Sequence, residues 1–289
     1  MIKYLFKAMR PRQWTKNAFV FAALVFDRQL LHLTSLLHTF LAFLIFCFLS
    51  SSVYLFNDVM DIEADRNHPV KKNRPIAAGK LPIPVAIAAA IILILGSLTG
   101  AYFLSVELAV IALVYLLMNL AYSKWLKHIP LIDVMIIAAG FVLRVAAGVS
   151  VIHVERFSPW LYVVTTLLAL YIGFGKRRAE ISVMGSSTGA HRKVLDGYSI
   201  TFIDQMITVV SATTIIAYSL YTFSAPNLPE NHAMMLTIPF VLYGIFRYLY
   251  LIQMKNEGGE PEEILLHDHP LQATIVLWGL TVLTIFYLF

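Results

Sequence analysis

The chain has 289 residues, of which 59% are hydrophobic and only 13% are charged, and its mean hydropathy is +0.74. These values exclude an ordinary soluble domain and predict an all-α, polytopic membrane protein whose main surroundings are the lipid bilayer. The net charge of +5 has no basic soluble domain to carry it, so no binding of nucleic acid is expected. The single cysteine, Cys47, excludes a disulfide within the chain.

Apolar runs long enough to span a bilayer predict about nine transmembrane helices, at 17–31, 33–56, 84–104, 106–122, 131–152, 160–175, 203–223, 234–252 and 271–289. Lysine and arginine gather before the first run and after the second, fourth, sixth and eighth runs, whereas the opposite loops hold only Arg28 and Arg156. By the positive-inside rule the N-terminus is cytoplasmic and the C-terminus extracytoplasmic. We expect one domain over residues 1–289 in the plasma (inner) membrane, and the sequence leaves association into a homo-oligomer open.

The first run follows the sequence RPRQWTKN at residues 10–17. Aromatic and basic residues favour the headgroup layer, so the default expectation is an interfacial segment anchored by Trp14. The alternative is that Arg12 and Lys16, one helical turn apart, reach toward an anionic substrate.

The second run ends in NDVMDIEAD at residues 57–65, the first dense block of charge after nearly thirty largely apolar residues. On one continuous helix, Asp58, Asp61 and Asp65 fall within about 60° of one another, and Asn57 widens the arc to about 100°. Carboxylates this close repel unless a cation lies among them, and Mg²⁺ prefers such oxygen ligands and bridges them to phosphates. The spacing therefore predicts a Mg²⁺ site, with Mn²⁺ as a second candidate ion; a solvated helix end is the alternative.

A basic, proline-rich loop follows, with prolines at 69, 75, 82 and 84 that exclude a long helix. Such a loop is able to close over a phosphate ligand as a lid. Within it, Arg74 of the RPIAAG segment is the expected phosphate contact, because a guanidinium binds phosphate with two parallel hydrogen bonds. Lys72 and Lys80 are expected to be ordinary positive-inside charges.

The fifth run carries Asp133 one turn inside its start and Arg144 eleven residues later, about 20° away around the helix and roughly 16 Å along it. Gly140 and Gly148 lie on the same stripe, where small residues also favour close helix packing. A cation deep in a span is costly, so we expect Arg144 to line an anion pocket. Asp133 is expected either to order a basic residue or to bind substrate hydroxyls, and the sequence does not choose.

The sixth run ends in KRRAE at residues 176–180. Lys176, Arg177 and Glu180 span about 100° of one helix face, and Arg178 is turned away. In the next loop Arg192 is either a further anion contact or a loop charge. His267 and His269 alternate in an acidic loop, which is weak support for a metal site.

NDxxDxxxD followed by RPxxxG resembles the first aspartate-rich motif of the UbiA superfamily of intramembrane prenyltransferases. RPxQWxKN, YSxxLK and GFVLRxAAG resemble the branch of that superfamily that transfers phosphoribose to polyprenyl phosphates. The resemblance implies a helical bundle with a polar cavity on the cytoplasmic side. Typical members carry a second aspartate-rich motif where this chain has KRRAE, so the change replaces a metal-bridged anion site with a directly cationic one.

The resemblance implies transfer of 5-phosphoribose from 5-phosphoribosyl 1-diphosphate to a decaprenyl-type polyprenyl phosphate, with release of diphosphate, for cell-envelope precursors. Two alternatives stay open: a conventional prenyltransferase with a prenyl diphosphate donor and an aromatic or other acceptor, and a membrane transporter. Asp58, Asp61 and Asp65 are the expected catalytic metal ligands, with Asn57 as a further oxygen donor. The expected substrate-binding residues are the polar positions in and around the motifs, namely Lys16, Tyr54, Asn57, Lys71, Arg74, Tyr122, Lys124, Lys127, Asp133, Arg144, Lys176, Arg177, Glu180 and Arg192.

Overall fold

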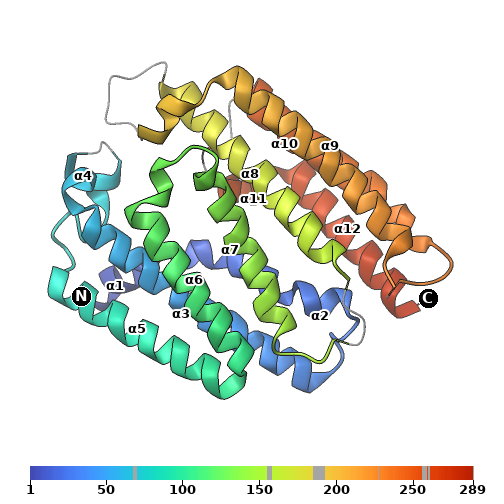
Figure 1. Ribbon diagram of the computed structural model, residues 1–289, viewed down its shortest axis with the longest axis horizontal. Helices are drawn as coiled ribbons and strands as arrows, with labels where there is room; N and C mark the ends of the chain where they lie inside the picture. Colours follow the sequence, from blue (N-terminus) through green and yellow to red (C-terminus); the bar gives the residue numbers. More distant parts are fainter. Residues whose placement is uncertain are drawn as a thin grey trace. The chain divides into compact units, whose positions relative to one another are not determined.

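Figure 1 shows a computed structural model that describes residues 1–67, 70–154, 158–184, 193–226, 228–255, 259 and 261–288. Every regular element within these ranges is a helix, as the composition predicts. The chain divides into two compact units: unit 1 is Met1–Leu24, Gln29–Lys127 and Leu143–His153, and unit 2 is Val25–Arg28, His128–Val142 and Val154–Phe289. A single domain over the whole chain stays a prediction.

Unit 1 is built around α3, which packs against the 3₁₀ helix η1 and against α5 and α6 (Figure 1). The C-terminal part of α7 completes it. Its elements are α1 (Ile2–Ala8), η1 (Pro11–Phe21), α3 (Leu33–Met60), α4 (Ile62–Asn67), η2 (Lys71–Asn73), α5 (Ile83–Leu104) and α6 (Val106–Lys124); α7 spans Ile132–Val149. The short helices α2 (Ala22–Phe26) and η3 (Leu126–His128) cross the unit boundaries.

Unit 2 contains the start of α7 and a group of long helices in which α8 packs against α9 and α10, and α10 packs against α12. Its remaining elements are α8 (Trp160–Met184), η4 (Lys193–Gly197), α9 (Ile200–Ser224), η5 (Ala233–Thr237), α10 (Ile238–Met254), α11 (Pro261–His267) and α12 (His269–Leu288). Buried apolar side chains of α8, α9 and α10, such as Tyr171, Ile207 and Tyr248, form its core.

Local sequence fixes where several helices begin. Ser105 accepts the backbone N–H of Leu108 at 3.3 Å to cap α6, and Ser199 accepts that of Phe202 at 3.1 Å to cap α9. Proline lies in the first turn of α5, where its missing N–H costs nothing. Between Arg66 and Pro82 the described residues form only the three-residue η2 and the end of α4, as the prolines of that loop predict.

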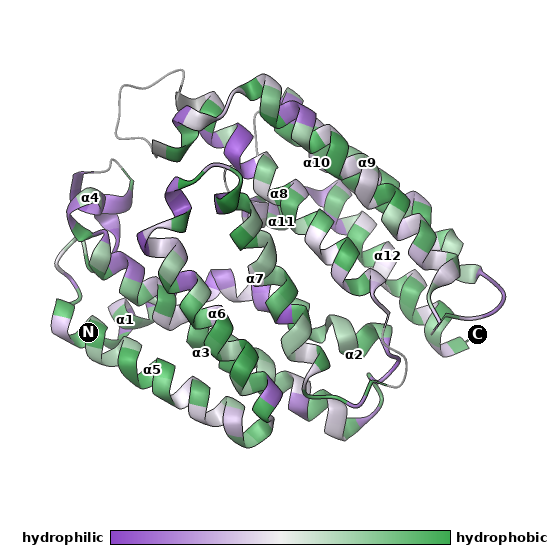
Figure 2. Cartoon of the chain, in the orientation of Figure 1, coloured by the Kyte–Doolittle hydropathy of each residue, from purple (hydrophilic) through white to green (hydrophobic). Residues whose placement is uncertain are grey.

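Seven helices in the described residues are long and apolar enough to cross a membrane: α3, α5, α6, α7, α9, η5–α10 and α12. Large apolar side chains on them are exposed, such as Ile92 and Phe103, which suits a surface that faces lipid. In Figure 2 these helices are green for most of their length, whereas α4 is purple. The protein is therefore a membrane protein, and the count of nine spans stays a prediction.

Two expectations about helix bounds are corrected. The run 17–31 is no continuous α-helix, because it divides between η1, α2 and the turn at Arg28, whose φ is 57°. The helix that carries the acidic motif is also interrupted, since α3 ends at Met60 and α4 begins at Ile62. Asp61, with φ −96° and ψ 13°, lies at this break.

Candidate functional site

The acidic motif lies in unit 1, at the junction of α3 and α4. The junction keeps helical hydrogen bonds on both sides, from the Asp61 N–H to the Asn57 carbonyl at 2.9 Å and from the Asp65 N–H to the Asp61 carbonyl at 2.8 Å. Asp58 and Asp65 are buried, with exposed fractions of 2% and 3%, whereas the Asp61 side chain is 44% exposed. The sequence predicts that the three carboxylates share one helix face. This prediction is wrong for Asp61, because the turn at this residue separates its carboxylate from those of Asp58 and Asp65.

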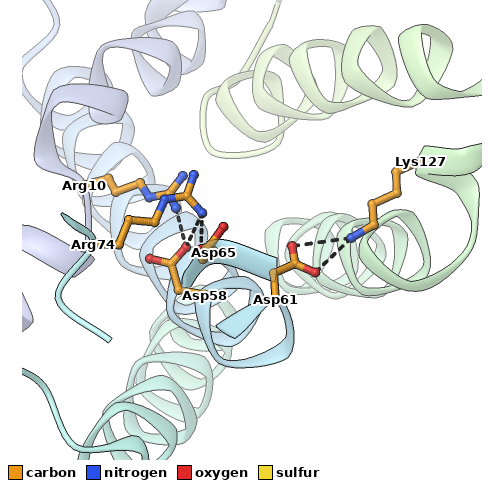
Figure 3. A network of polar contacts seen from close by, with 6 residues as sticks. All are labelled: Arg10, Asp58, Asp61, Asp65, Arg74 and Lys127. Carbon is orange, nitrogen blue, oxygen red and sulfur yellow. Dashed lines mark hydrogen bonds and ion pairs between the residues drawn. The ribbon is translucent and has the colours of Figure 1, made fainter. Parts of the chain in front are cut away.

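Three cations from different segments pair with these acids (Figure 3). Arg74 Nη1 lies 3.1 Å from Asp58 Oδ1 and 2.6 Å from Asp65 Oδ2, so one guanidinium joins the two buried carboxylates. Arg10 forms a second ion pair with Asp58. Lys127 Nζ lies 3.3 Å from Asp61 Oδ1.

The donor set of this cluster suits a hard divalent cation, since it offers carboxylate and amide oxygens. Asn57 Oδ1 is buried and accepts no hydrogen bond from any described residue, so an oxygen is left for a ligand. Within the described ranges, however, no three acidic, histidine or cysteine side chains are arranged to hold a metal ion. In Figure 3 Asp58 and Asp65 are turned toward Arg74 and Arg10, and Asp61 is turned away from them toward Lys127, so the three carboxylates do not meet at one point.

The N-terminal segment packs on α3, and its expected location at the membrane interface stays a prediction. Trp14 Nε1 donates to Ser51 Oγ at 3.0 Å, and Ser51 Oγ also lies 3.0 Å from the Met9 carbonyl oxygen. Asn17, fully buried, donates to Cys47 Sγ and Ser50 Oγ, each at 3.3 Å. These contacts hold the chain around Arg10 against the helix that carries the acids.

Arg144 lies in unit 1 on the C-terminal part of α7 and is only 6% exposed. Its Nε donates to Asn17 Oδ1 at 2.8 Å, its Nη2 donates to the Tyr115 hydroxyl at 2.8 Å, and its guanidinium carbon lies 5.0 Å from the centre of the Tyr115 ring. A Cβ on Gly148 would lie 1.9 Å from the Val20 carbonyl oxygen, so this glycine serves close packing of α7 on η1. An anion pocket at Arg144 stays a prediction.

Unit 2 holds a second polar cluster, around Asp133 at the start of α7. Asp133 Oδ2 lies 2.8 Å from Arg177 Nε, and Asp133 Oδ1 accepts a hydrogen bond from the Tyr198 hydroxyl at 2.7 Å. Arg177 also pairs with Glu180. A Cβ on Gly173 would lie 2.7 Å from Val134 Cγ1, so this glycine lets α8 approach α7 closely enough for Arg177, one turn later, to reach Asp133.

This cluster agrees with the first of the two roles left open for Asp133, because its carboxylate pairs with a basic residue, and a contact with substrate hydroxyls stays a prediction. Arg177 itself is 1% exposed and has two carboxylate partners. Its direct contact with phosphate stays a prediction. Burial and the hydrogen bond to Asp133 raise the pKa of Tyr198 above its usual value, so its hydroxyl keeps its proton.

The other predicted residues are distributed over both units. Arg178 pairs with Asp204 at 2.7 Å and, as expected, faces away from Arg177. Arg192 lies outside the described residues. Lys16, Tyr54, Tyr122 and Lys176 are half-buried; Lys71 and Lys124 are exposed, and Lys124 Nζ lies 4.6 Å from the centre of the Trp125 ring.

Residue spacing missed Arg10, Asn17, Tyr115 and Tyr198 as members of the polar clusters. One signal was present for Arg10, because the dipeptide Arg-Pro occurs at residues 10–11 and again at 74–75, and both arginines contact Asp58. The partners of Asn17, Tyr115 and Tyr198 are distant in sequence, so no spacing rule identifies them.

Residues 18–263 match the UbiA prenyltransferase family. This match covers most of the chain, so the protein belongs to that family, and the resemblance seen in its motifs is confirmed.

The relatives include decaprenyl-phosphate phosphoribosyltransferase of Mycobacterium tuberculosis (strain ATCC 25618 / H37Rv), 35% identical over 280 residues that cover 96% of this chain and 92% of that protein. The protein of the same name from Corynebacterium glutamicum is 35% identical over 288 residues, 95% of this chain and 84% of its own length. A UbiA homolog from Archaeoglobus fulgidus, solved bound to GPP and Mg²⁺, is 20% identical and superposes with a TM-score of 0.74 over 97% of this chain and 99% of that one. This last likeness shows the fold.

Proposed function

We propose that this protein transfers the 5-phosphoribosyl group from 5-phosphoribosyl 1-diphosphate to a polyprenyl phosphate. The bond from the ribose C1 to the diphosphate oxygen breaks, a bond from C1 to an acceptor phosphate oxygen forms, and diphosphate leaves. The observation that carries this proposal is the similarity, over nearly the full length, to relatives named decaprenyl-phosphate phosphoribosyltransferase.

The acidic cluster of unit 1 supports a metal-dependent reaction. Mg²⁺ held by Asp58, Asp61, Asp65 and Asn57 would neutralise the charge that develops on the leaving diphosphate. Arg74 would bind a phosphate group directly, since its guanidinium has more donors than its two carboxylate partners use. A polyprenyl phosphate is already ionised near neutral pH, so the acceptor needs no general base.

The KRRAE segment supports phosphoribosyl transfer over ordinary prenyl transfer. We propose that Lys176 contacts a phosphate group, while Arg177, tied to Asp133 and Glu180, fixes the helix turn from which Lys176 projects. A second aspartate-rich motif would require a second metal, whereas this turn of α8 supplies fixed positive charge.

The assay that tests the proposal compares two donors. Purified protein is incubated with polyprenyl phosphate and either labelled 5-phosphoribosyl 1-diphosphate or labelled prenyl diphosphate, with Mg²⁺ present. We expect a labelled lipid product only from the phosphoribosyl donor. Product only from the prenyl donor, with an aromatic acceptor supplied, would establish the prenyltransferase alternative instead.

We also propose that the protein lies in the plasma membrane with its N-terminus and acidic cluster in the cytoplasm. The support is the distribution of Lys and Arg along the sequence. A reporter fused after residue 289 is expected to be extracytoplasmic, and one inserted near residue 187 to be cytoplasmic. The opposite pattern would overturn this orientation.

A further inference from the structure

All three carboxylates of the acidic cluster are ion-paired. Asp58 Oδ1 contacts both Arg10 and Arg74, Asp65 Oδ2 contacts Arg74, and Asp61 contacts Lys127 (Figure 3). One oxygen of Asp58, one of Asp65 and both of Asp61 contact these cations. A metal ion that binds these oxygens therefore competes with the ion pairs, and it displaces a cation wherever it uses the same oxygen.

Arg10 is the cation whose surroundings best suit such an exchange. Its backbone has φ 54° and ψ 62°, a conformation that is rare for a residue other than glycine and that clusters at functional sites. The guanidinium carbon lies 4.9 Å from the centre of the Tyr54 ring, and among the described residues Asp58 is the one acid that it contacts. A guanidinium has five N–H donors, so most of those of Arg10 remain for a further anion.

The N-terminal segment has contacts with α3 besides the ion pair of Arg10. Trp14 and the Met9 carbonyl already bind Ser51, and Asn17 binds Cys47 and Ser50. The ion pair of Arg10 includes Asp58, a candidate metal ligand. Its location therefore suits a role in binding the metal ion and the diphosphate.

We propose that Arg10 is a diphosphate-binding residue. When the metal and the diphosphate bind together, the Arg10 side chain moves from Asp58 to the phosphate oxygens of the substrate. Leaving a buried charge without a partner is strongly unfavourable. In this exchange Asp58, only 2% exposed, is paired first with arginine and then with the metal, and Arg10 is paired first with carboxylate and then with phosphate. Metal and diphosphate should then bind cooperatively, since each supplies the partner that the other displaces.

The inference rests on the proposed function in one respect, that the donor carries a diphosphate. Its test therefore measures binding and not turnover.

Mn²⁺ binding is measured by electron paramagnetic resonance and calorimetry on full-length protein in detergent, with MnCl₂ alone and with MnCl₂ plus inorganic diphosphate. For Arg10→Ala we expect binding of Mn²⁺ alone to become tighter by roughly two- to tenfold, because a competing cation is gone. Diphosphate in the presence of Mn²⁺ should bind about ten- to a hundredfold more weakly, because a charge-assisted contact is lost.

The matched control is Lys7→Ala, which removes one positive charge three residues away. Lys7 is exposed, and its ammonium makes no ion pair or hydrogen bond with a described residue, so both binding constants should stay at the wild-type value. If Arg10→Ala does not fold, Arg10→Gln, which keeps the length of the side chain, is measured instead, with the same changes expected.

Opposite changes in the two binding constants would support the exchange. A parallel loss of Mn²⁺ and diphosphate binding would show that Arg10 only holds Asp58 in place, and unchanged constants would show that it has no part in binding; either result would overturn the inference. A failure of the proposed function can be told apart from a failure of this inference. It would appear in the donor assay of the wild-type protein and would leave these binding constants unaffected.

Discussion

The Nε atom of Arg177 lies 2.8 Å from Oδ2 of Asp133, and the two side chains are 1% and 0% exposed. The pair joins α8 to the start of α7 within unit 2, and Tyr198 binds the second oxygen of the same carboxylate. A charge buried this deeply is stable only while its partner is present. The KRRAE segment therefore contains a structural cation, Arg177, next to Lys176, the cation that we assign to substrate.

Replacing these two neighbours should separate the two roles. Arg177→Met leaves Asp133 without its ion-pair partner, which should destabilise the protein by about 3–5 kcal/mol and lower its melting temperature in detergent. Lys176→Met, the matched control, should melt near the wild-type temperature but bind a phosphorylated substrate about ten- to a hundredfold more weakly. A stable Arg177→Met protein with the same loss of affinity would show that Arg177 contacts phosphate directly.

The Tyr198 hydroxyl is the second support of Asp133. It donates to Asp133 Oδ1 at 2.7 Å and accepts the Leu131 N–H at 2.6 Å, so Tyr198→Phe leaves both groups without this partner. We expect a loss of about 1–3 kcal/mol in the free energy of unfolding. Tyr243→Phe is the control, because that tyrosine is 48% exposed and its hydroxyl makes no hydrogen bond with a described residue. Equal melting temperatures for the two variants would contradict a supporting role for Tyr198.

Most helices were predictable from the sequence because the length of an apolar run depends on local composition alone. The runs 33–56, 84–104 and 106–122 correspond to α3, α5 and α6 within a few residues. The acidic motif was likewise found from spacing. Its geometry was not, because a value of 100° per residue assumes an unbroken helix and α3 ends at Met60.

The pairing of charges was the part that spacing could not supply. Arg10 and Lys127 are 48 and 66 positions away from their carboxylate partners, so only the fold brings them together. Helical spacing places Arg177 with Lys176, because both lie on one face of α8. Its burial depends on the close approach of α8 to α7 at Gly173, which is a property of tertiary packing.

The pair of Asp268 and Arg247 predicts a dependence of stability on pH. Arg247 Nη2 donates to Asp268 Oδ2 at 2.8 Å, and Asp268 Oδ1 accepts the Leu271 N–H at 2.9 Å. The hydrogen bond from Arg247 lowers the pKa of Asp268 below its usual value of 3.8. A lowered pKa means that the carboxylate stabilises the fold above the pKa of the unfolded chain, and that this contribution is lost as the pH falls through the lower pKa of the folded state.

We therefore expect the melting temperature of the wild-type protein to fall between about pH 5 and pH 3 more steeply than that of Asp268→Asn, which lacks the titrating group. At pH 7 Asp268→Asn should be the less stable of the two. Glu230→Gln, a change at an exposed acid, should follow the wild-type curve. Identical acid dependence in all three proteins would remove Asp268 as a contributor.

The acids of unit 1 allow the metal requirement to be separated from stability, because Asp61 and Asp58 differ in exposure. The Asp61 side chain is 44% exposed and pairs with one lysine, so Asp61→Asn should change the free energy of unfolding by no more than about 1 kcal/mol. Asp58 is 2% exposed and contacts two arginines, so Asp58→Asn should cost about 1–3 kcal/mol. Both variants should lose Mg²⁺-dependent turnover, because each removes a charged oxygen ligand.

Glu63→Gln is the control for the metal requirement, since this exposed glutamate on α4 is expected to face away from the other acids. Turnover is measured over a titration of Mg²⁺, with EDTA at zero metal, and the melting temperature of each variant is recorded in the same detergent. We expect Glu63→Gln to keep the wild-type titration curve, Asp61→Asn to be folded but inactive, and the wild type to be inactive in EDTA. Activity of the wild type in EDTA, or an unchanged Mg²⁺ titration for Asp61→Asn, would rule out a catalytic metal at this cluster.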